Sequence, residues 1–422
     1  MDDILPGEIE KWQWIEEKAR VFFDASGFKE IRTPLLEPTE LFVRSIGQAS
    51  DIVHKEMFSL KDRGDRDMTL RPEMTASVTR SVIENGLLTQ AKFLKLYYMG
   101  PMFRAERPQA GRKRQFHQMG VEIINKSNIG GFQVDFEVIF QLCSFLRYVG
   151  LTNFHLRLND LGNVSDQQQL VFKLKRYFFQ EKSKLCSDCH YRLDKNVLRI
   201  FDCKNKNCQP VIDKVPWDQM TPLSDKFKTL GDCIKSSSVM DRPIPFEIDR
   251  RLVRGLDYYN GIVFEITAEG LGAQNAVAGG GRYDRLYQDL GGNATPCTGF
   301  SIGMERLLIA LEAQDPKAFE ALKGRKVYFA PLEDNPGILE FCREEAIRLR
   351  EAGIRIETGH GIFSLSQHLK KANQQGGRFV VIVGPDEWSQ RSVLVKDLEK
   401  REQTEVPLER ILSHLKKAMR LC

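Results

Sequence analysis

Residues 93–124 read FLKLYYMGPMFRAERPQAGRKRQFHQMGVEII. Both ends of this stretch, Phe93–Phe103 and Gln115–Ile124, are rich in residues that favour strands. Between them, Arg104–Arg114 contains a proline and a glycine, which is typical of a loop. The stretch therefore predicts a long antiparallel hairpin. Its tip concentrates positive charge that the balance of the whole chain hides, in Arg107, Arg112, Lys113 and Arg114.

The composition around this hairpin is that of an ordinary globular protein. The chain has 422 residues, with 62 Lys+Arg against 57 Asp+Glu and a net charge of +5. Its length suggests two or three domains, and the composition excludes a disordered, collagen-like or histone-like chain. A charged N-terminal segment and the lack of any run of about 18 apolar residues predict neither a signal peptide nor a membrane span. Nine cysteines, an odd and scattered number, favour a cytoplasmic location over a disulfide framework.

The residue composition and pattern of the chain change twice. Residues 160–245 are polar and helix-prone, and strand signals return after them, so we expect an insertion within a first domain that covers residues 1–325. From Lys326 onward, strands and helices alternate. This alternation predicts a small α/β domain over residues 326–422.

Three familiar nucleotide or hydrolase motifs are absent or lack their context. There is no GxxxxGK[ST] sequence, and Gly359-His360-Gly361 lacks the third glycine of a dinucleotide fingerprint. Gly299–Gly303 matches GxSxG, but a nucleophile elbow needs a buried strand before its serine. The preceding residues, GGNATPCT, argue against a central strand. We therefore expect a glycine-rich turn there, and no serine hydrolase.

Four cysteines within the insertion form two pairs, Cys186-Ser-Asp-Cys189 and Cys203-Lys-Asn-Lys-Asn-Cys208, separated by 13 residues. Thiolates bind Zn²⁺ tetrahedrally, so a structural zinc ion is one interpretation. The second pair is wider than usual, and free cysteine is also a common small buried residue. The sequence favours this second interpretation and predicts no metal site.

Arg104, Arg254 and Arg306 stand out as phosphate-binding candidates. Arginine is always charged and binds phosphate through a fork of donors. Three arginines on sheet elements could hold a triphosphate without a P-loop, although any one of them alone is more simply a surface residue.

Two glutamates are the candidate partners for a cationic substrate. Glu73 lies in the segment LRPEMT, and Glu122 lies on the second hairpin strand. Gln118 precedes Glu122 by four residues, so both project from one face of that strand. A buried unpaired charge is very costly, so Glu122 requires a partner. A substrate amine or imidazole is one candidate, and a structural arginine is the other.

Five stretches together resemble the signature sequences of the histidyl-tRNA synthetases, which are class II aminoacyl-tRNA synthetases. They are LRPEMT (70–75), GPMFRAERPQAGRKRQFHQMGVE (100–122), RRLVRGLDYYNG (250–261), AGGGRYDRL (278–286) and GFSIGMERL (299–307). The resemblance implies an α+β fold in which helices flank an antiparallel catalytic sheet, with an inserted helical subdomain and a C-terminal α/β anticodon-binding domain. It also implies a homodimer that uses L-histidine, ATP with Mg²⁺, and tRNA(His).

The resemblance also assigns roles to individual residues. It implies that Arg104 holds the α-phosphate and Arg306 the far phosphates, while Arg254 neutralises charge at the transferring phosphorus. Arg254 and Arg104 are thus the expected catalytic residues. The remaining substrate contacts that it implies are Glu73, Thr75 and Gln118 for the amino group, Glu122 and Tyr259 for the imidazole, and Tyr258 and Tyr283 lining the pocket.

Two further expectations follow from the motifs. Met74 occupies a position where many family members have glycine, which adds bulk beside the amino-acid site. The basic hairpin tip resembles the loop that meets the tRNA acceptor end. The main alternative is a non-catalytic relative, the regulatory subunit of ATP phosphoribosyltransferase. Its members lack the C-terminal domain and usually the arginine of RGLDYY, and this chain has both.

Overall fold

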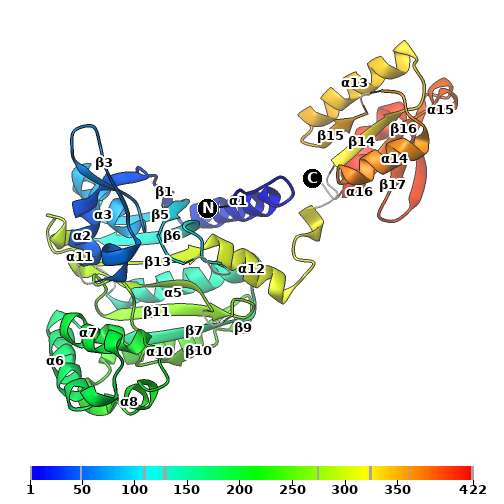
Figure 1. Ribbon diagram of the computed structural model, residues 1–422. Coiled ribbons are helices and arrows are strands. Elements are labelled where there is room, and N and C mark those ends of the chain that lie inside the picture. Colours follow the sequence, from blue (N-terminus) through cyan, green and yellow to red (C-terminus); the bar gives the residue numbers. More distant parts are fainter. Residues whose placement is uncertain are drawn as a thin grey trace. The chain divides into compact units, whose positions relative to one another are not determined.

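The computed structural model describes residues 2–47, 50–107, 111–126, 131–272, 275–322, 326–359 and 361–419. The chain forms two compact units, Met1–Asp315 and Pro316–Cys422 (Figure 1). No helix among the described residues is long and apolar enough to cross a membrane. The tip of the hairpin, residues 108–110, and His360 lie outside the described residues.

The first unit is built on an eight-stranded sheet in the order β1-β5-β6-β13-β12-β11-β7-β10. The two edge strands run parallel to their neighbours, and all other neighbours are antiparallel. The predicted hairpin is confirmed, with β5 and β6 paired from Phe93↔Asn125 to Phe103↔Gln115. The strands are β1 (Lys29–Glu30), β5 (Phe93–Phe103), β6 (Gln115–Asn125), β7 (Phe154–Asp160), β10 (Phe246–Ile248), β11 (Ile262–Ala268), β12 (Ala276–Arg282) and β13 (Cys297–Gly303).

Helices cover one face of this sheet. Phe23 of α1 is fully buried, and its ring contacts Phe145 of α5, Tyr97 of β5 and Phe300 of β13. Side chains alternate between the two faces of a strand, so the neighbouring Tyr98 must point to the opposite face. The helices on this apolar side are α1 (Ile9–Ala25), α5 (Phe132–Tyr148) and α12 (Met304–Gln314).

The opposite face is covered by shorter elements that surround a cleft. They contribute a three-stranded sheet in the order β2-β4-β3 and helices that bury Val78 and Leu286 in a common apolar cluster. These elements are β2 (Leu36–Pro38), α2 (Thr39–Ile46), the π-helix η1 (Ile52–Glu56), β3 (Phe58–Lys61), β4 (Asp67–Leu70), α3 (Thr75–Glu84), α4 (Leu87–Gln90) and α11 (Asp284–Asp289).

The segment between β7 and β10 is a helical insertion, and its part from Leu170 to Met220 has its own core. Leu174, Phe178, Ile200 and Ile212 are buried in this core, together with three cysteines. Helix α10 (Asp225–Ser236) packs instead against α5. The elements of the insertion are α6 (Val164–Gln180), η2 (Lys182–Lys184), α7 (Ser187–Lys195), η3 (Val197–Asp202), α8 (Gln209–Asp213), α9 (Trp217–Met220), α10 (Asp225–Ser236), β8 (Ser238–Val239) and β9 (Arg242–Pro243).

The second unit is a five-stranded mixed sheet with helices, in the strand order β15-β14-β16-β17-β18. The first three strands are parallel, and the last two pair antiparallel. The unit comprises η4 (Glu320–Leu322), β14 (Lys326–Pro331), α13 (Pro336–Glu351), β15 (Arg355–Thr358), α14 (Leu365–Gln374), β16 (Gly377–Val383), α15 (Pro385–Ser389), β17 (Ser392–Asp397), β18 (Glu402–Pro407), η5 (Leu408–Arg410) and α16 (Ile411–Met419).

Two local expectations were wrong. Residues 299–303 belong to strand β13 rather than to a turn, and Ser301 pairs with both neighbouring strands. Arg254, expected on a sheet element, lies instead in the loop before β11. Arg104 begins the hairpin loop after β5, as predicted, and Arg306 lies in the first turn of α12.

Candidate active site

Small residues form the floor of the cleft. One row across the sheet runs Glu265, Gly279, Ser301, Gly120 and Tyr98, through strands β11, β12, β13, β6 and β5. Three of these five residues are glycine or serine, so the centre of the row carries almost no side-chain volume. Gly299, Ser301 and Gly303 of the GxSxG sequence therefore lie on one face of strand β13, and their small size leaves space above the sheet.

Larger side chains occupy the space that the strand glycines leave free. Glu122 of β6 pairs with Gly299 of β13, and a Cβ atom on Gly299 would lie 1.9 Å from Glu122 Oε2. A Cβ atom on Gly279 would lie 2.5 Å from Cζ of Arg254, and one on Gly120 would lie 2.5 Å from the hydroxyl of Tyr98. Strand glycines thus mark places where a neighbouring group approaches closely.

A cavity of about 140 Å³ lies over this floor. It is smaller than the roughly 300 Å³ at which pockets for drug-sized ligands begin, so it suits a molecule of amino-acid size. Its lining residues are Ile52, Glu73, Thr75, Tyr98, Arg104, Gln118, Glu122, Arg254, Gly255, Leu256, Tyr258, Tyr259, Gly299, Phe300 and Ser301.

Glu73 lies at the start of helix α3. Its two carboxylate oxygens accept hydrogen bonds from the backbone N–H groups of Thr75 (2.7 Å) and Ala76 (2.9 Å), and Tyr258 donates to it at 3.3 Å. Burial raises the pKa of Glu73, and the two backbone donors oppose that rise. The helix N-terminus therefore fixes the direction of this carboxylate and favours its charged form.

Glu122 is buried more severely and has only hydroxyl donors. Thr75 Oγ1 donates to Glu122 Oε1 at 2.7 Å, and the Tyr283 hydroxyl donates to Oε2. Burial raises the pKa of Glu122 to about 8, with the nearby Glu73 adding to the rise. A cation in the cavity would favour the ionised carboxylate, because an opposite charge at close range lowers a carboxyl pKa.

Gln118 presents an acceptor without a partner. Its Nε2 donates to Ser301 Oγ at 3.4 Å, while its Oε1 is buried and has no hydrogen-bond partner among the described residues. Buried polar atoms are nearly always satisfied, so this oxygen points to a ligand that donates a hydrogen bond.

Arg254 carries a buried hydrogen-bond donor, where Gln118 carries a buried acceptor. Its Nη1 forms an ion pair with Glu265 Oε2 at 2.7 Å, and its Nε is buried with no partner in the described part of the chain. A buried guanidinium donor without an acceptor suits an anionic ligand group. Glu265 and the open surface of Gly279 hold the guanidinium beside the cavity.

Arg104 is held in place through the Nε atom of its guanidinium group. Its Nε donates to the carbonyl oxygen of Pro72 at 2.9 Å, and its guanidinium lies 5.2 Å from the ring centre of Phe116. Glu106 forms an ion pair with Arg112 at 2.7 Å and lies 3.9 Å from Arg104. These contacts hold the start of the hairpin loop beside the cavity.

The cavity brings together eight residues that the sequence nominated: Glu73, Thr75, Arg104, Gln118, Glu122, Arg254, Tyr258 and Tyr259. Tyr283 lies behind them and holds Glu122. Met74 is buried outside the lining, where its sulfur accepts a hydrogen bond from Thr33. Arg306 is also outside the lining, and its pKa is lowered by burial and by the charge of Arg112. The other basic tip residues are Lys113, which pairs with Asp2 at 3.4 Å, and the exposed Arg107 and Arg114.

Several residues that line the cavity were not predicted from the sequence. Tyr98, Gly255, Gly299 and Ser301 contribute to the cavity but were not nominated. Tyr98 could have been found from the hairpin, because it lies directly opposite Gly120 in the antiparallel register. Ile52 carried no such signal, since η1 joins the cavity only through the packing of the whole unit.

Comparison with known proteins shows the family of the chain. A model of the histidyl-tRNA synthetases matches residues 1–175 and 212–307, and a model of an anticodon-binding domain matches residues 326–418. The chain belongs to the histidyl-tRNA synthetase family. The resemblance found in the sequence is thereby confirmed, and so is the class II synthetase fold.

Individual synthetases match over nearly their whole length. The histidine–tRNA ligase of Desulforamulus reducens is 41% identical over 98% of this chain and 97% of its own. That of Prochlorococcus marinus is 44% identical over 94% of this chain and 91% of its own. The apo histidyl-tRNA synthetase of S. aureus superposes with a TM-score of 0.72 and 29% identity, covering 99% of this chain and 98% of that one.

The match to the histidyl-tRNA synthetase model is interrupted within the insertion. The matched ranges leave out residues 176–211, which contain α7, η3 and both cysteine pairs.

Proposed function

We propose that this protein is a histidine–tRNA ligase whose active site is the cavity over Gly279, Ser301 and Gly120. In the first step, a carboxylate oxygen of histidine bonds to the α-phosphorus of ATP, and the bond to the bridging β-phosphate oxygen breaks. Pyrophosphate leaves with the electron pair. In the second step, a ribose hydroxyl of the 3′-terminal adenosine of the tRNA attacks the acyl carbon, and AMP leaves.

The observation that carries the proposal is the pairing of opposite charges in one small cavity. Two buried carboxylates, Glu73 and Glu122, line the same space of about 140 Å³ as Arg104 and Arg254. Such a space can hold a zwitterion whose cationic end meets the glutamates, while its carboxylate and an ATP phosphate lie on the side of the arginines.

Glu73, Thr75 and Gln118 are suited to hold the substrate ammonium group. Glu73 offers a carboxylate fixed by a helix N-terminus, and Gln118 Oε1 is an acceptor without a partner in the described residues. Glu122 and Tyr259 would then bracket the imidazole. A site built to pair both ring nitrogens rejects analogues that lack them by about 10⁴–10⁵-fold.

Arg254 is suited to stabilise the charge that develops at the phosphorus. It is anchored by Glu265, and its buried Nε has no partner among the described residues. A fixed guanidinium loses little reorganisation energy during the reaction, and for this reason electrostatic stabilisation by fixed groups is often the largest catalytic contribution. Arg104 would hold the α-phosphate from the other side, and Arg306 the far phosphates.

The remaining partners follow from family membership. Mg²⁺ would arrive with ATP as the counterion of its phosphates. The basic tip residues Arg107, Arg112, Lys113 and Arg114 would meet the acceptor end of tRNA(His), and the second unit would bind the anticodon. A homodimer and a cytoplasmic location complete the proposal. The non-catalytic regulatory subunit is less supported, because Arg254 is present and the second unit matches an anticodon-binding domain.

The test is histidine-dependent exchange of pyrophosphate into ATP, measured with histidine against other amino acids. Arg254→Ala should lower the exchange rate constant by about 10²–10³-fold while the KM for histidine changes little, because its contact forms mainly in the transition state.

The matched control is Arg251→Ala. Arg251 lies three residues away and forms an exposed ion pair with Asp213 at 2.9 Å. This variant should retain the exchange rate of the unmodified protein. No exchange by well-folded protein would refute the ligase function, and equal losses in binding and rate for Arg254→Ala would refute the role of that arginine.

A further inference from the structure

We propose that Cys186, Cys189, Cys203 and Cys208 bind a single structural Zn²⁺ ion through four thiolates. The four sulfur atoms all lie within 4.8 Å of one another, and Cys186 Sγ is 3.7 Å from Cys203 Sγ. Four thiolates arranged tetrahedrally at about 2.3 Å from Zn²⁺ have their sulfur atoms about 3.8 Å apart. The spacing in the structure is therefore that of a mononuclear tetrathiolate site.

A disulfide arrangement fits these distances poorly. A disulfide requires about 2.05 Å between sulfur atoms, far less than the separation of Cys186 and Cys203. The eight described cysteines are unbonded to one another. In the described residues, the quartet is also the one group of three or more side chains placed to hold a metal ion.

The backbone prepares the site in two ways. Cys186 directly precedes α7 and Cys189 lies in its first turn, so the helix brings the two sulfur atoms to one side. Backbone N–H groups donate to the other pair, from Cys186 to Cys208 Sγ at 3.2 Å and from Asn205 to Cys203 Sγ at 3.4 Å. Such donors stabilise thiolate charge.

The wide spacing of the second pair, which weighed against zinc in the sequence, is explained by a turn. The backbone N–H of Cys208 donates to the carbonyl oxygen of Asn205 at 3.0 Å, and the Asn205 side chain accepts from the backbone of Asn207 at 2.9 Å. The two additional residues are taken up in this turn. It returns Cys208 to within reach of Cys203.

The zinc site would also support the loop that contains Arg254, and this second inference rests on the proposed function. The helix η3 lies between the two cysteine pairs, and its Arg199 forms an ion pair with Asp51 at 2.7 Å. Asn196 donates to Asp257 at 2.9 Å, and a Cβ atom on Gly255 would lie 2.7 Å from Arg199 Nη1. The segment that zinc would fix therefore packs against the residues that follow Arg254.

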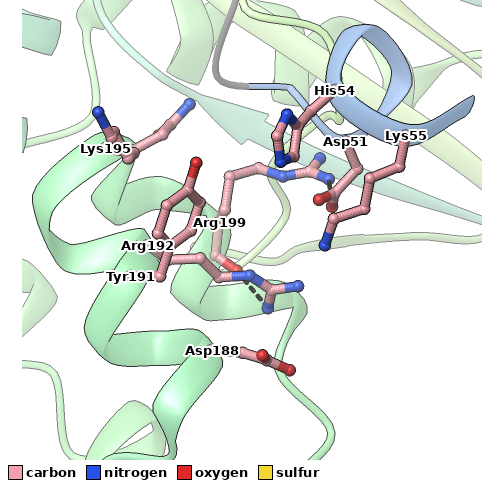
Figure 2. Close-up of a pocket in the computed structure, with 9 residues that line it drawn as sticks. Asp51, His54, Lys55, Asp188, Tyr191, Arg192, Lys195 and Arg199 are labelled. Carbon is pink, nitrogen blue, oxygen red and sulfur yellow. Dashed lines mark hydrogen bonds and ion pairs between the residues drawn. The ribbon is translucent and has the colours of Figure 1, made fainter. Parts of the chain in front are cut away.

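Figure 2 shows this junction from the side of a second cavity. Residues of η1 and its preceding residue Asp51 lie on one wall, and α7 with Arg199 lies on the other, around a space of about 240 Å³. Because α7 begins at the first cysteine pair, loss of the metal should loosen this wall.

The experiment measures metal in the full-length protein purified without added metal or chelator. We expect about one zinc ion per chain in the unmodified protein, and a content about tenfold lower in Cys186→Ser and Cys208→Ser. The matched control is Cys233→Ser, which removes a half-buried cysteine of α10 outside the quartet and should leave the zinc content unchanged. Replacing zinc by Co²⁺ should give the strong visible and thiolate charge-transfer bands of a tetrahedral thiolate complex.

Each of three results would contradict zinc binding by the four cysteines. The first is little zinc and no cobalt spectrum in well-folded protein, the second is bound iron in place of zinc, and the third is equal zinc loss in Cys233→Ser. The metal readouts are independent of enzyme activity. Absent pyrophosphate exchange in zinc-loaded protein would refute the ligase function alone, whereas normal exchange in zinc-free protein would refute the support of the Arg254 loop.

Discussion

At the scale of single residues, the two buried glutamates of the cavity are held by different kinds of donor. Glu73 receives two backbone N–H groups from the start of α3, whereas Glu122 receives only the hydroxyls of Thr75 and Tyr283. Backbone donors at a helix N-terminus favour the carboxylate strongly. Glu122 is thus the group whose charge depends most on whether the cavity contains a cation.

Glu122→Gln should therefore change the pH dependence of stability. Burial raises the pKa of Glu122 from 4.5 to about 8 in the folded protein. The stability contributed by its proton is complete below about pH 4.5 and is lost as the pH rises to about 8. Glutamine stays neutral, so the stability of the variant relative to the unmodified protein should rise between pH 6 and pH 9, by on the order of 2–3 kcal/mol.

Thermal unfolding of both proteins at pH 6 and pH 9 checks this expectation. An exposed glutamate of α1, Glu17, provides the control through Glu17→Gln, which should follow the unmodified protein at both pH values. A Glu122→Gln variant that loses stability equally at both pH values would show that Glu122 is ionised in the empty site.

At the scale of elements, strand glycines decide where functional side chains fit. Gly120, Gly279 and Gly299 belong to three adjacent strands, and each makes room for a side chain from elsewhere. Glycine weakens a strand because it packs nothing and loses more conformational freedom on folding. The loss is offset here by contacts that no larger residue would permit.

Gly279→Ala should separate this effect from folding. Its added Cβ would meet the terminal guanidinium atoms of Arg254 at 2.5–2.6 Å, and a flexible side-chain end can move aside. We expect a folded protein whose pyrophosphate exchange is lowered by about 10²-fold, since a displacement of about 1 Å can have that effect on a reacting group.

Gly231→Ala is the matched control. Gly231 lies inside α10, and a Cβ atom there would contact nothing within 4 Å. Alanine in a helix interior stabilises by about 0.5–1 kcal/mol relative to glycine, so this variant should raise Tm slightly and keep full exchange activity. If Gly279→Ala also kept full activity, the position of Arg254 over Gly279 would be unimportant for the reaction.

At the scale of the whole molecule, the residues of the proposed active site and the core of the second unit come from different parts of the sequence. Every residue that lines the proposed active site lies before residue 316, and the second unit has its own apolar core around Val327, Phe329, Ile338 and Val381. Two units with independent cores can fold separately.

A protein ending at Asp315 should therefore keep histidine-dependent exchange within about threefold, because every lining residue of the proposed active site belongs to the first unit. Its kcat/KM for tRNA charging should fall by about 10²-fold or more, since joining two binding units raises affinity through effective concentration. Parallel assays of exchange and charging on the same preparation check both expectations. Loss of exchange in a well-folded truncated protein would show that the second unit contributes to the first step.

The sequence by itself determined the features that depend on local pattern. The hairpin of β5 and β6 and the alternating elements after Lys326 follow from residue type and period, and the structure contains both. The family followed from five short motifs whose residues are contiguous. Glu122 and Gln118 were paired correctly on one strand face because that relation spans only four residues.

Only the tertiary structure decided what distant segments do together. Tyr98, Gly279 and Ser301 share one row of the sheet through register across three strand pairs, and no local pattern encodes that register. The cysteine quartet is similar, because a spacing that looked too wide closes through a turn at Asn205. Side-chain direction along one strand depends on neighbouring residues alone, whereas a cavity depends on which strands become neighbours, and packing of the whole unit determines that.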